Sequence, residues 1–241
     1  MPEQNKAKGR LYAVGVGPGD PELLTLKAAR VIGQCPVIAA PRTAGGRMLA
    51  WEIARRALPA QQLAGKTLLP LDFAMSTDPA RCAAAHAAAA DRVEAELAAG
   101  RDVAMLNIGD VSLYASCGYL LDALAARGYE TGRVAGVPSF CAAAALLNES
   151  LTGIDTPVHI LPGGAVPLDE ALDWPGTKII MKSARRLPEV IGTLRAKGLA
   201  GRSSLAANCG LPGQLLLPDL EGDAAAALDA GYFVTVIVKE G

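Results

Sequence analysis

The sequence predicts an α/β protein of two α/β domains: an N-terminal open parallel sheet and a second, mixed-sheet domain, with a ligand cleft between them. Short apolar runs alternate with helical stretches, which implies right-handed strand–helix–strand crossovers in a parallel sheet. Glycine turns follow two of these runs, at residues 15–19 and 109–110, where such sheets bind ligands. After Pro138 glycine and proline interrupt the chain more often. We therefore place the domains at residues 1–140 and 141–241.

The first domain opens with a strand, a glycine turn and a helix. Residues 11–16 are apolar and rich in valine, as in a buried parallel strand. Asp20 suits the N-cap and Pro21 the first position of a helix that we place over residues 21–33. Its apolar face would begin with three leucines, Leu23, Leu24 and Leu26.

The remaining elements of this domain continue the alternation. Apolar runs that end at turn residues predict strands at residues 36–40, 67–71, 102–107 and 132–136. Periodic stretches predict helices over residues 47–57 and 80–99, and from the loop at 108–114 to Arg127. Gly100 closes the long helix, and turn residues predict a loop over residues 72–78.

In the second domain the predicted elements are shorter. Strands are expected at residues 158–161, 178–182, 204–208 and 232–238. Helices are expected at residues 142–147 and 187–197. A cleft between the two domains would be lined by the loops at the strand ends.

The glycine turn differs from a dinucleotide-binding loop. That fingerprint has a third glycine where this chain has Asp20, whose carboxylate would occupy the free N–H groups and repel a phosphate. The acidic residue expected about 20 positions later is missing, and no Gly-Lys-Ser/Thr follows the turn. The turn therefore suits a ligand without a phosphate chain, or it serves only to reverse the chain.

Composition and charge exclude several classes of function. Hydrophobic residues make up 51% of the chain and aromatic residues 4%, so a large core of small side chains can form. The formal net charge of −1 predicts neither nucleic acid nor an anionic membrane as partner. Five dispersed cysteines and a polar start predict a cytoplasmic protein. His86 and His159 lie far apart, and we expect no metal site.

Four segments together resemble one family, the tetrapyrrole methylases, which transfer methyl groups from S-adenosylmethionine to corrinoid precursors and related substrates. The segment Val14-Gly-Val-Gly-Pro-Gly-Asp-Pro-Glu-Leu-Leu-Thr-Leu-Lys-Ala resembles the family's opening signature. Gly109-Asp-Val-Ser-Leu-Tyr is similar to its central Gly-Asp-Pro-x-x-Tyr/Phe loop. Gly136-Val-Pro-Ser-Phe resembles its Pro-Gly-Val-Ser-Ser segment, and Ile179-Ile-Met-Lys a strand of its second domain. The resemblance covers nearly the whole chain.

Within the family, the chain most resembles the precorrin-2 C20-methyltransferase branch, through residues 21–28, 110–116 and 136–140. This implies methylation of C20 of precorrin-2 or cobalt-factor II in cobalamin biosynthesis. Two positions depart from the pattern: Val111 stands where many relatives have proline, and Ala135 where many begin Pro-Gly-Val. Both affect the stiffness of a loop.

The resemblance also implies which residues contact S-adenosylmethionine. They lie on the glycine loops and on second-domain elements: Pro18, Ile108, Gly109, Asp110, Leu113, Ser139, Phe140, Met181, Ala206 and Ala207. Glycine loops at strand ends expose the backbone groups that an adenosine and an amino-acid tail require. From the residues alone, Asp110 could instead cap the following helix, and Met181 could belong to the core.

Methyl transfer is an in-line displacement, so the main task is to position donor and acceptor. A base could then remove the C20 proton, and Asp20, Asp110 and Tyr114 are the candidates, with Glu22 and Tyr119 as further ones. Because the substrate carries many carboxylates, we expect cations to bind it. The candidates follow strands: Arg42, Arg47, Lys182, Arg185 and Arg186. The alternative is that they are solvated charges.

Two other classes of function remain open. A same-fold enzyme could methylate another tetrapyrrole carbon or the diphthamide precursor on a protein; a protein substrate would need an acceptor groove open at one end. A non-catalytic module could bind S-adenosylmethionine or a tetrapyrrole and would yield no methylated product. For the enzyme we expect a homodimer, because a flat apolar face suits a two-fold interface.

Overall fold

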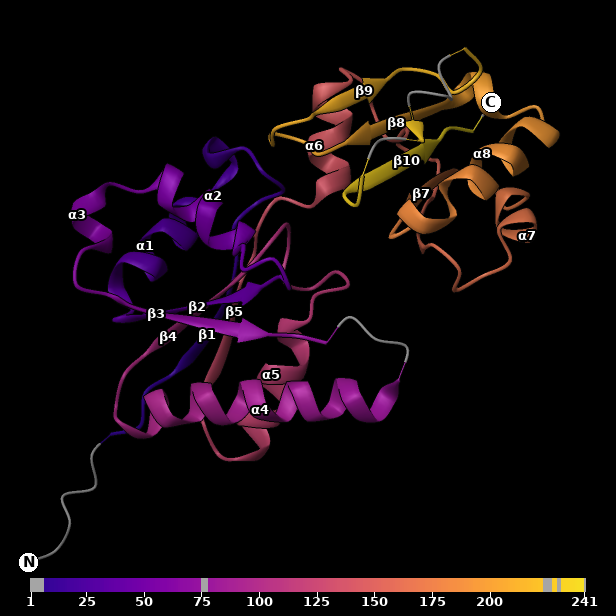
Figure 1. The fold of residues 1–241 in the computed structure, drawn as a ribbon. Helices are drawn as coiled ribbons and strands as arrows, with labels where there is room; N and C mark the ends of the chain where they lie inside the picture. Colours follow the sequence, from indigo (N-terminus) through magenta and orange to yellow (C-terminus); the bar gives the residue numbers. More distant parts are fainter. Residues whose placement is uncertain (1–6, 75–77, 223–226, 229–230, 241) are drawn as a thin grey trace, which may run out of the picture. The chain divides into compact units, whose positions relative to one another are not determined.

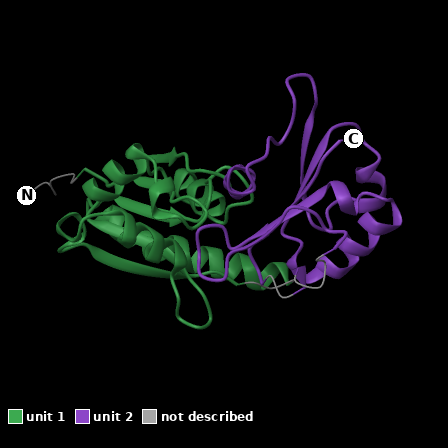
Figure 2. Ribbon diagram, turned by 90° about the horizontal axis from the view of Figure 1, so that it is seen from above, with its two compact units in different colours: residues 1–138 green, residues 139–241 purple. Residues whose placement is uncertain are grey.

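The computed structural model describes residues 7–74, 78–222, 227–228 and 231–240. The chain divides into two compact units, unit 1 with residues 1–138 and unit 2 with residues 139–241 (Figure 2). Part of the polar start and the middle of the loop predicted over residues 72–78 lie outside the described residues.

Unit 1 contains a parallel five-stranded sheet of order β3-β2-β4-β1-β5. Its strands are β1 (Leu11–Gly15), β2 (Val37–Arg42), β3 (Thr67–Asp72), β4 (Val103–Asn107) and β5 (Thr131–Val134). Strands of such a sheet are covered on both faces, which explains why β1 and β4 are apolar along nearly their whole length.

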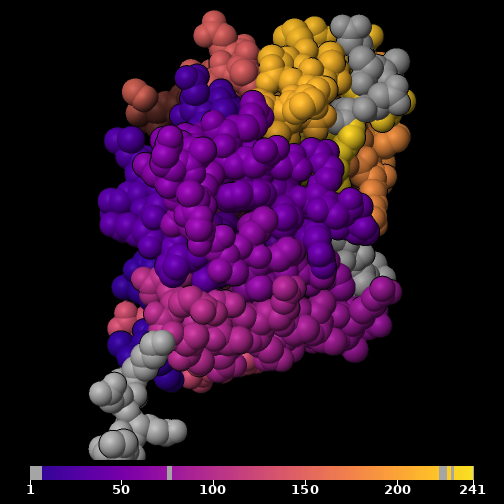
Figure 3. Space-filling model, turned by 60° about the vertical axis from the view of Figure 1, so that its left-hand side comes forward, coloured from indigo at the N-terminus to yellow at the C-terminus, as the bar shows by residue number. Residues whose placement is uncertain are grey.

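Helices cover both faces of this sheet (Figure 1). On one side lie α1 (Leu26–Gln34), α2 (Leu49–Ala57) and α3 (Ala60–Leu63), and on the other α4 (Pro79–Ala98) and α5 (Cys117–Ala126). Leu97 of α4 and Leu124 of α5 are fully buried in one cluster with Leu11 and Met105 of the sheet. Each such side chain stabilises the unit by about 1.5–3 kcal/mol. In Figure 3 the segment of α2, α3 and β3 (purple) and α4 (magenta) form one continuous surface.

Unit 2 contains a mixed sheet of order β6-β7-β10-β8-β9. Its strands are β6 (Val158–Pro162), β7 (Thr177–Met181), β8 (Ser203–Ala207), β9 (Leu215–Leu217) and β10 (Val234–Val238). Among the described strands of this sheet, β6 and β7 pair in parallel and the other neighbours pair antiparallel. Its helices are α6 (Ser139–Leu146), α7 (Leu168–Leu172) and α8 (Leu187–Ala196). Leu194 of α8 packs with Leu205 and Val236 on one face, while Ala143 of α6 packs with Ala206 and Ile237 on the other.

The predicted fold class is confirmed: both units are α/β, the first parallel and the second mixed. The helix predicted over residues 21–33 is wrong at its start. A single 3-10 turn spans Pro21–Leu23, Leu24 is extended, and α1 begins at Leu26. The reason is a second cap, because the Thr25 side chain accepts a hydrogen bond from the backbone N–H of Ala28. Leu26, predicted on the apolar face, is 91% exposed.

Other elements differ at their ends. The helix predicted at residues 142–147 begins earlier, at Ser139, and the strand predicted at 232–238 begins later, at Val234. The strand predicted at 132–136 ends at Val134, which leaves Gly136 in a loop. Among the described residues, the short elements α3, α7 and β9 and the 3-10 turns Ala184–Arg186 and Ala200–Arg202 were not predicted.

The topology places the loops after β1 and β4 side by side. These two strands are neighbours in the sheet, but the chain leaves β1 toward α1 on one face and β4 toward α5 on the other (Figure 1). Adjacent strands whose connections diverge leave an opening at their carboxyl ends, the usual ligand position in an open α/β sheet.

Candidate functional site

Three loops of unit 1 meet at the carboxyl end of its sheet, and we call them together the glycine site (residues 15–20, 107–112 and 135–137). An antiparallel bridge joins the first two: the N–H of Gly109 donates to the carbonyl of Gly17 at 2.8 Å, and the reverse bond measures 3.3 Å. Two segments more than ninety residues apart are thereby held in one register.

Close packing of backbone requires glycine at this site. A Cβ on Gly136 would lie 2.2 Å from the carbonyl oxygen of Gly109, and one on Gly15 would lie 2.7 Å from the same atom. Gly17 and Gly109 have φ angles of 76° and 72°, a region that side chains disfavour. The glycine turn is therefore more than a chain reversal, since it packs against two other loops.

Asp110 ties these loops together. One carboxylate oxygen accepts hydrogen bonds from the backbone N–H of Ser112, at 2.8 Å, and from the Ser112 hydroxyl. The other oxygen accepts from the backbone N–H of Gly136 at 2.8 Å. Burial raises the pKa of this carboxyl, but the hydrogen bonds from Ser112 and Gly136 outweigh it and leave the pKa below its usual value. Asp110 is thus ionised at neutral pH, and its carboxylate positions the backbone of the neighbouring loops, as a cap does.

The other candidates of unit 1 have local roles. Asp20 accepts a hydrogen bond from the N–H of Glu22 at 2.9 Å and caps the 3-10 turn after Pro18. The carbonyl of Ile108 accepts from the side chain of Asn107 at 2.8 Å. Tyr114 is 41% exposed and has a positive φ of 51°, and Leu113 lies beside it, partly buried.

In unit 2, three of the predicted cofactor residues come together around a residue that sequence reasoning missed. Across the sheet, Met181, Thr235 and Ala206 stand in one row. The hydroxyl of Thr235 lies 3.3 Å from that of Ser139, at the start of α6. Thr235 is a lone polar residue within Val-Thr-Val-Ile-Val, and this interruption of an apolar strand was the available signal.

Two more predicted cofactor residues of unit 2, Phe140 and Ala207, do not present their side chains in this row. Phe140 is buried in the first turn of α6. The side chain of Ala207 belongs to the core on the opposite face of the sheet. Only its backbone could serve a ligand beside Thr235.

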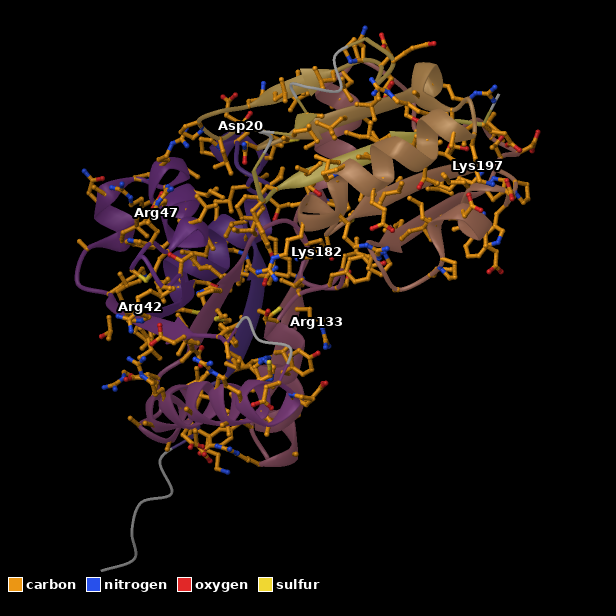
Figure 4. All side chains as sticks on the ribbon, turned by 45° about the vertical axis from the view of Figure 1, so that its right-hand side comes forward. Asp20, Arg42, Arg47, Arg133, Lys182 and Lys197 are labelled. Atoms are coloured by element: carbon orange, nitrogen blue, oxygen red, sulfur yellow. The ribbon has the colours of Figure 1, made fainter. Side chains whose placement is uncertain are left out.

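The predicted substrate cations are in different states. Arg42 forms a two-bond ion pair with Asp72, at 2.9 and 2.6 Å, and Arg47 forms one with Glu52, at 3.3 and 2.7 Å. Figure 4 shows both arginines on the same side of unit 1.

Arg186 forms an ion pair with Glu189, whereas Lys182 and Arg185 form no ion pair with any described residue. Lys182 has a positive φ of 57°, and its partial burial lowers the pKa of its ammonium group.

The residues present fit a phosphate-free cofactor. The glycine site carries the Asp110 carboxylate, and no lysine or arginine belongs to its three loops, which suits a ligand without phosphate. The row of Met181, Thr235 and Ala206 offers one hydroxyl among small or apolar side chains.

Among the described residues no three histidine, cysteine or acidic side chains gather as a metal site. Within that same part of the chain, no helix has both the length and the apolar character to cross a membrane.

Comparison with known sequences identifies the family. The family model of the Tetrapyrrole (Corrin/Porphyrin) Methylases matches residues 10–225. Cobalamin biosynthesis protein CobIJ of Mycobacterium tuberculosis is 35% identical over 98% of this chain, which spans 47%, about half, of that relative's length. Cobalt-precorrin-2 C(20)-methyltransferase of Salmonella typhimurium is 30% identical, over 96% of this chain and 97% of the relative. Precorrin-4 C(11)-methyltransferase of Pseudomonas aeruginosa is 33% identical over 59% of this chain and 49% of the relative.

Solved structures agree on the fold. The cobalt precorrin-4 methyltransferase CbiF superposes with a TM-score of 0.73 at 19% identity, covering 95% of this chain and 94% of that one. Uroporphyrin-III C-methyl transferase from Thermus thermophilus, complexed with S-adenyl homocysteine, gives a TM-score of 0.69 at 24% identity, covering 96% and 98%. The family and the cofactor inferred from the four motifs are thereby confirmed. The chain belongs to the tetrapyrrole (corrin/porphyrin) methylases, an S-adenosylmethionine-dependent family.

Proposed function

We propose that this protein is a C-methyltransferase of cobalamin biosynthesis that methylates C20 of precorrin-2 or cobalt-factor II. The observation that carries the proposal is the likeness to the Salmonella C(20)-methyltransferase, which extends over nearly the full length of both chains. The likeness to the C(11)-methyltransferase covers a smaller part of this chain. Methylation of another ring carbon such as C11 is therefore the alternative.

The residues of unit 1 suit the positioning task. S-adenosylmethionine, when bound, supplies an electrophilic methyl group. The bridge between Gly17 and Gly109 and the ties of Asp110 fix the backbone in advance, so little ordering is left for the moment of binding. Holding two reactants in the correct orientation can lower the activation barrier by about 7–11 kcal/mol relative to their free encounter in solution. A rigid backbone that positions the cofactor is therefore the main contribution that such a site can make.

In unit 2, Ser139 and Thr235 present a hydroxyl pair next to Met181 and Ala206. We assign this row to the adenosine part of the cofactor, because hydroxyl groups can pair with ring or ribose polar atoms. None of these side chains carries a negative charge, so none would hold the sulfonium in an ion pair and lower its reactivity.

Removal of the C20 proton requires an acceptor. Asp110 is engaged in three hydrogen bonds, so Tyr114 and Asp20 are the better candidates. Tyr114→Phe removes only a hydroxyl, and Tyr232→Phe is a matched control on an exposed tyrosine of unit 2. A role for Tyr114 predicts a lower kcat for its variant alone.

The regiochemistry decides the proposal. The enzyme is incubated with precorrin-2, or with its cobalt form, and a carbon-13 methyl donor, and the product is examined by NMR. A label on the meso carbon between rings A and D is expected. A label on C11 or C17 would refute the C20 assignment while keeping the family. Binding of both ligands without a labelled product would instead indicate a non-catalytic module, and a labelled protein would indicate a protein substrate.

We further propose that the enzyme is a homodimer. Light scattering at micromolar concentration should give twice the mass of the chain, and a monomer would contradict this without affecting the chemistry.

A further inference from the structure

An open groove runs along the start of α5 in unit 1, which we call the α5 groove. Its polar and aromatic lining consists of Ser112, Tyr114, Ser116, Tyr119, Asp122 and Arg133. The groove begins at the loop that follows Asp110, so it adjoins the glycine site.

Arg133 is the cation of this groove. It lies on the edge strand β5, opposite Ala13 in the register, and its side chain is exposed. Its guanidinium forms no ion pair and no hydrogen bond with any described residue. By contrast, Arg42 and Arg47 are each held by a neighbouring acid. Figure 4 places Arg133 on the other side of unit 1 from these two arginines.

The charge of Arg133 is felt at the buried start of α5. Burial raises the pKa of the Cys117 thiol to about 11, and the positive charge of Arg133 partly opposes this. Cys117 is the first residue of α5 and is fully buried. Arg133 lines the groove together with Ser116 and Gly118 at the start of α5.

The same groove offers an aromatic wall. Tyr119 is 61% exposed and stacks on the ring of His86, with centroids 4.3 Å apart and an interplanar angle of 15°. Tyr114 is exposed as well. Exposed rings backed by a second ring suit a flat unsaturated ligand. The other charge in the groove is Asp122, whose carboxylate would oppose an anionic ligand.

We propose that Arg133 binds a carboxylate arm of the tetrapyrrole, with an edge of the macrocycle against Tyr119 and Tyr114. The assignment rests on the proposed function, because it takes the substrate to be a carboxylate-bearing tetrapyrrole. An unpaired guanidinium can donate two parallel hydrogen bonds to a carboxylate. Arg133 is then a specificity-determining residue, which sets the angle at which the ring lies and hence which carbon faces the methyl donor.

The test measures affinity for a stable octacarboxylate, uroporphyrin III, by fluorescence quenching. Arg133→Gln should weaken its binding about tenfold, which corresponds to the loss of a charge-assisted hydrogen bond. The uroporphyrin affinity of Arg133→Lys should lie between those of the native protein and Arg133→Gln, since the charge remains but the two parallel hydrogen bonds are lost. Asp122→Asn should tighten binding. Arg30→Gln is the matched control, because Arg30 is an exposed cation outside the groove that donates a hydrogen bond to Gln34.

Two further readouts separate a binding role from a structural one. Affinity for S-adenosylhomocysteine should not change in any of these variants, and the tetrapyrrole KM of Arg133→Gln should rise with little change in kcat. The effect of Arg133 should also shrink as salt is added.

Equal uroporphyrin affinities of Arg133→Gln and Arg30→Gln would overturn the inference, even if C20 is methylated. A product labelled elsewhere, with weakened binding by Arg133→Gln, would instead refute the proposed reaction and support the role of Arg133. Failure of the unmodified enzyme to bind uroporphyrin III, with S-adenosylhomocysteine binding retained, would overturn the inference as well.

Discussion

Replacing Asp110 with asparagine tests whether this residue holds the glycine site together. The amide keeps the shape but presents an NH2 group where one oxygen stood, so the N–H of either Ser112 or Gly136 loses its acceptor. An unsatisfied buried donor costs about 1–3 kcal/mol, and the surviving bonds each lose about 1 kcal/mol with the charge. We therefore expect Asp110→Asn to lower the free energy of unfolding of unit 1 by about 3 kcal/mol at pH 7.

The pH dependence gives a second, independent check. In the folded protein the pKa of Asp110 lies below its usual value of 3.8, so its stabilisation is fully present above that pH. The stabilisation is lost as the pH falls through the folded pKa. The difference between the native protein and Asp110→Asn should consequently be largest at pH 5–7 and shrink near pH 3.

The assay can be confined to unit 1. The chain has two tryptophans, Trp51 in α2 and Trp174 in unit 2, and in a Trp174→Phe background urea unfolding followed by fluorescence reports on Trp51 alone. Asp122→Asn, at an exposed carboxyl of the same unit, is the control and should leave the stability unchanged. A loss below 1 kcal/mol at pH 7, or a difference that stays constant down to pH 3, would refute the role given to Asp110.

Three further predictions concern the two candidate sites. Gly15→Ala should destabilise unit 1 by about 2 kcal/mol or more, since its Cβ would meet backbone atoms at 2.7 Å. Gly118 is the control: it lies in a helix, and a Cβ there would meet no atom within 4 Å, so Gly118→Ala should stabilise unit 1 by about 0.5–1 kcal/mol in the same urea assay. Equal changes in stability for Gly15→Ala and Gly118→Ala would contradict the close packing described at Gly15. Gly109→Val places a branched residue at a φ of 72°, which costs about 1–3 kcal/mol, and calorimetry should show at least fivefold weaker binding of S-adenosylhomocysteine. Thr235→Val removes the partner of the Ser139 hydroxyl and should weaken that binding severalfold with native circular dichroism; unchanged affinity would remove the hydroxyl pair from the site.

The order of elements was predictable because local patterns and topology agree. The apolar runs at residues 103–107 and 234–238 are unmistakable strands, and their alternation with helices fixes a parallel sheet in unit 1. The start of α1 was not predictable, because Asp20-Pro21 and Thr25 are both good helix starts. A contact distant in sequence favours the second: the Thr25 hydroxyl also lies 3.4 Å from the carbonyl of Ala135.

The candidate site was predictable in part. The sequence motifs identified Asp110 and Gly109 as candidate site residues. The sequence could not show that the Asp110 carboxylate accepts a hydrogen bond from the N–H of Gly136, because that partner lies 26 residues away. Their charge made Arg42 and Arg47 candidates for binding the substrate, yet Asp72 on the neighbouring strand pairs with Arg42, and Glu52 pairs with Arg47. Whether a cation is already paired depends on tertiary structure, and for the same reason Arg133 attracted no notice in the sequence.

The bridge between Gly17 and Gly109 has a consequence for the order in which the protein folds. In the sheet, β4 lies between β2 and β1, so a nascent chain that ends before residue 103 holds β1 and the neighbouring strands β2 and β3, with an empty position between β1 and β2. Insertion of β4 at this position closes a loop of about ninety residues. This step is slow, because the chain loses conformational entropy before the new contacts form. The floor of the glycine site is assembled only when this step is complete. During synthesis, cofactor capture should therefore begin late, after β4 has left the ribosome and inserted.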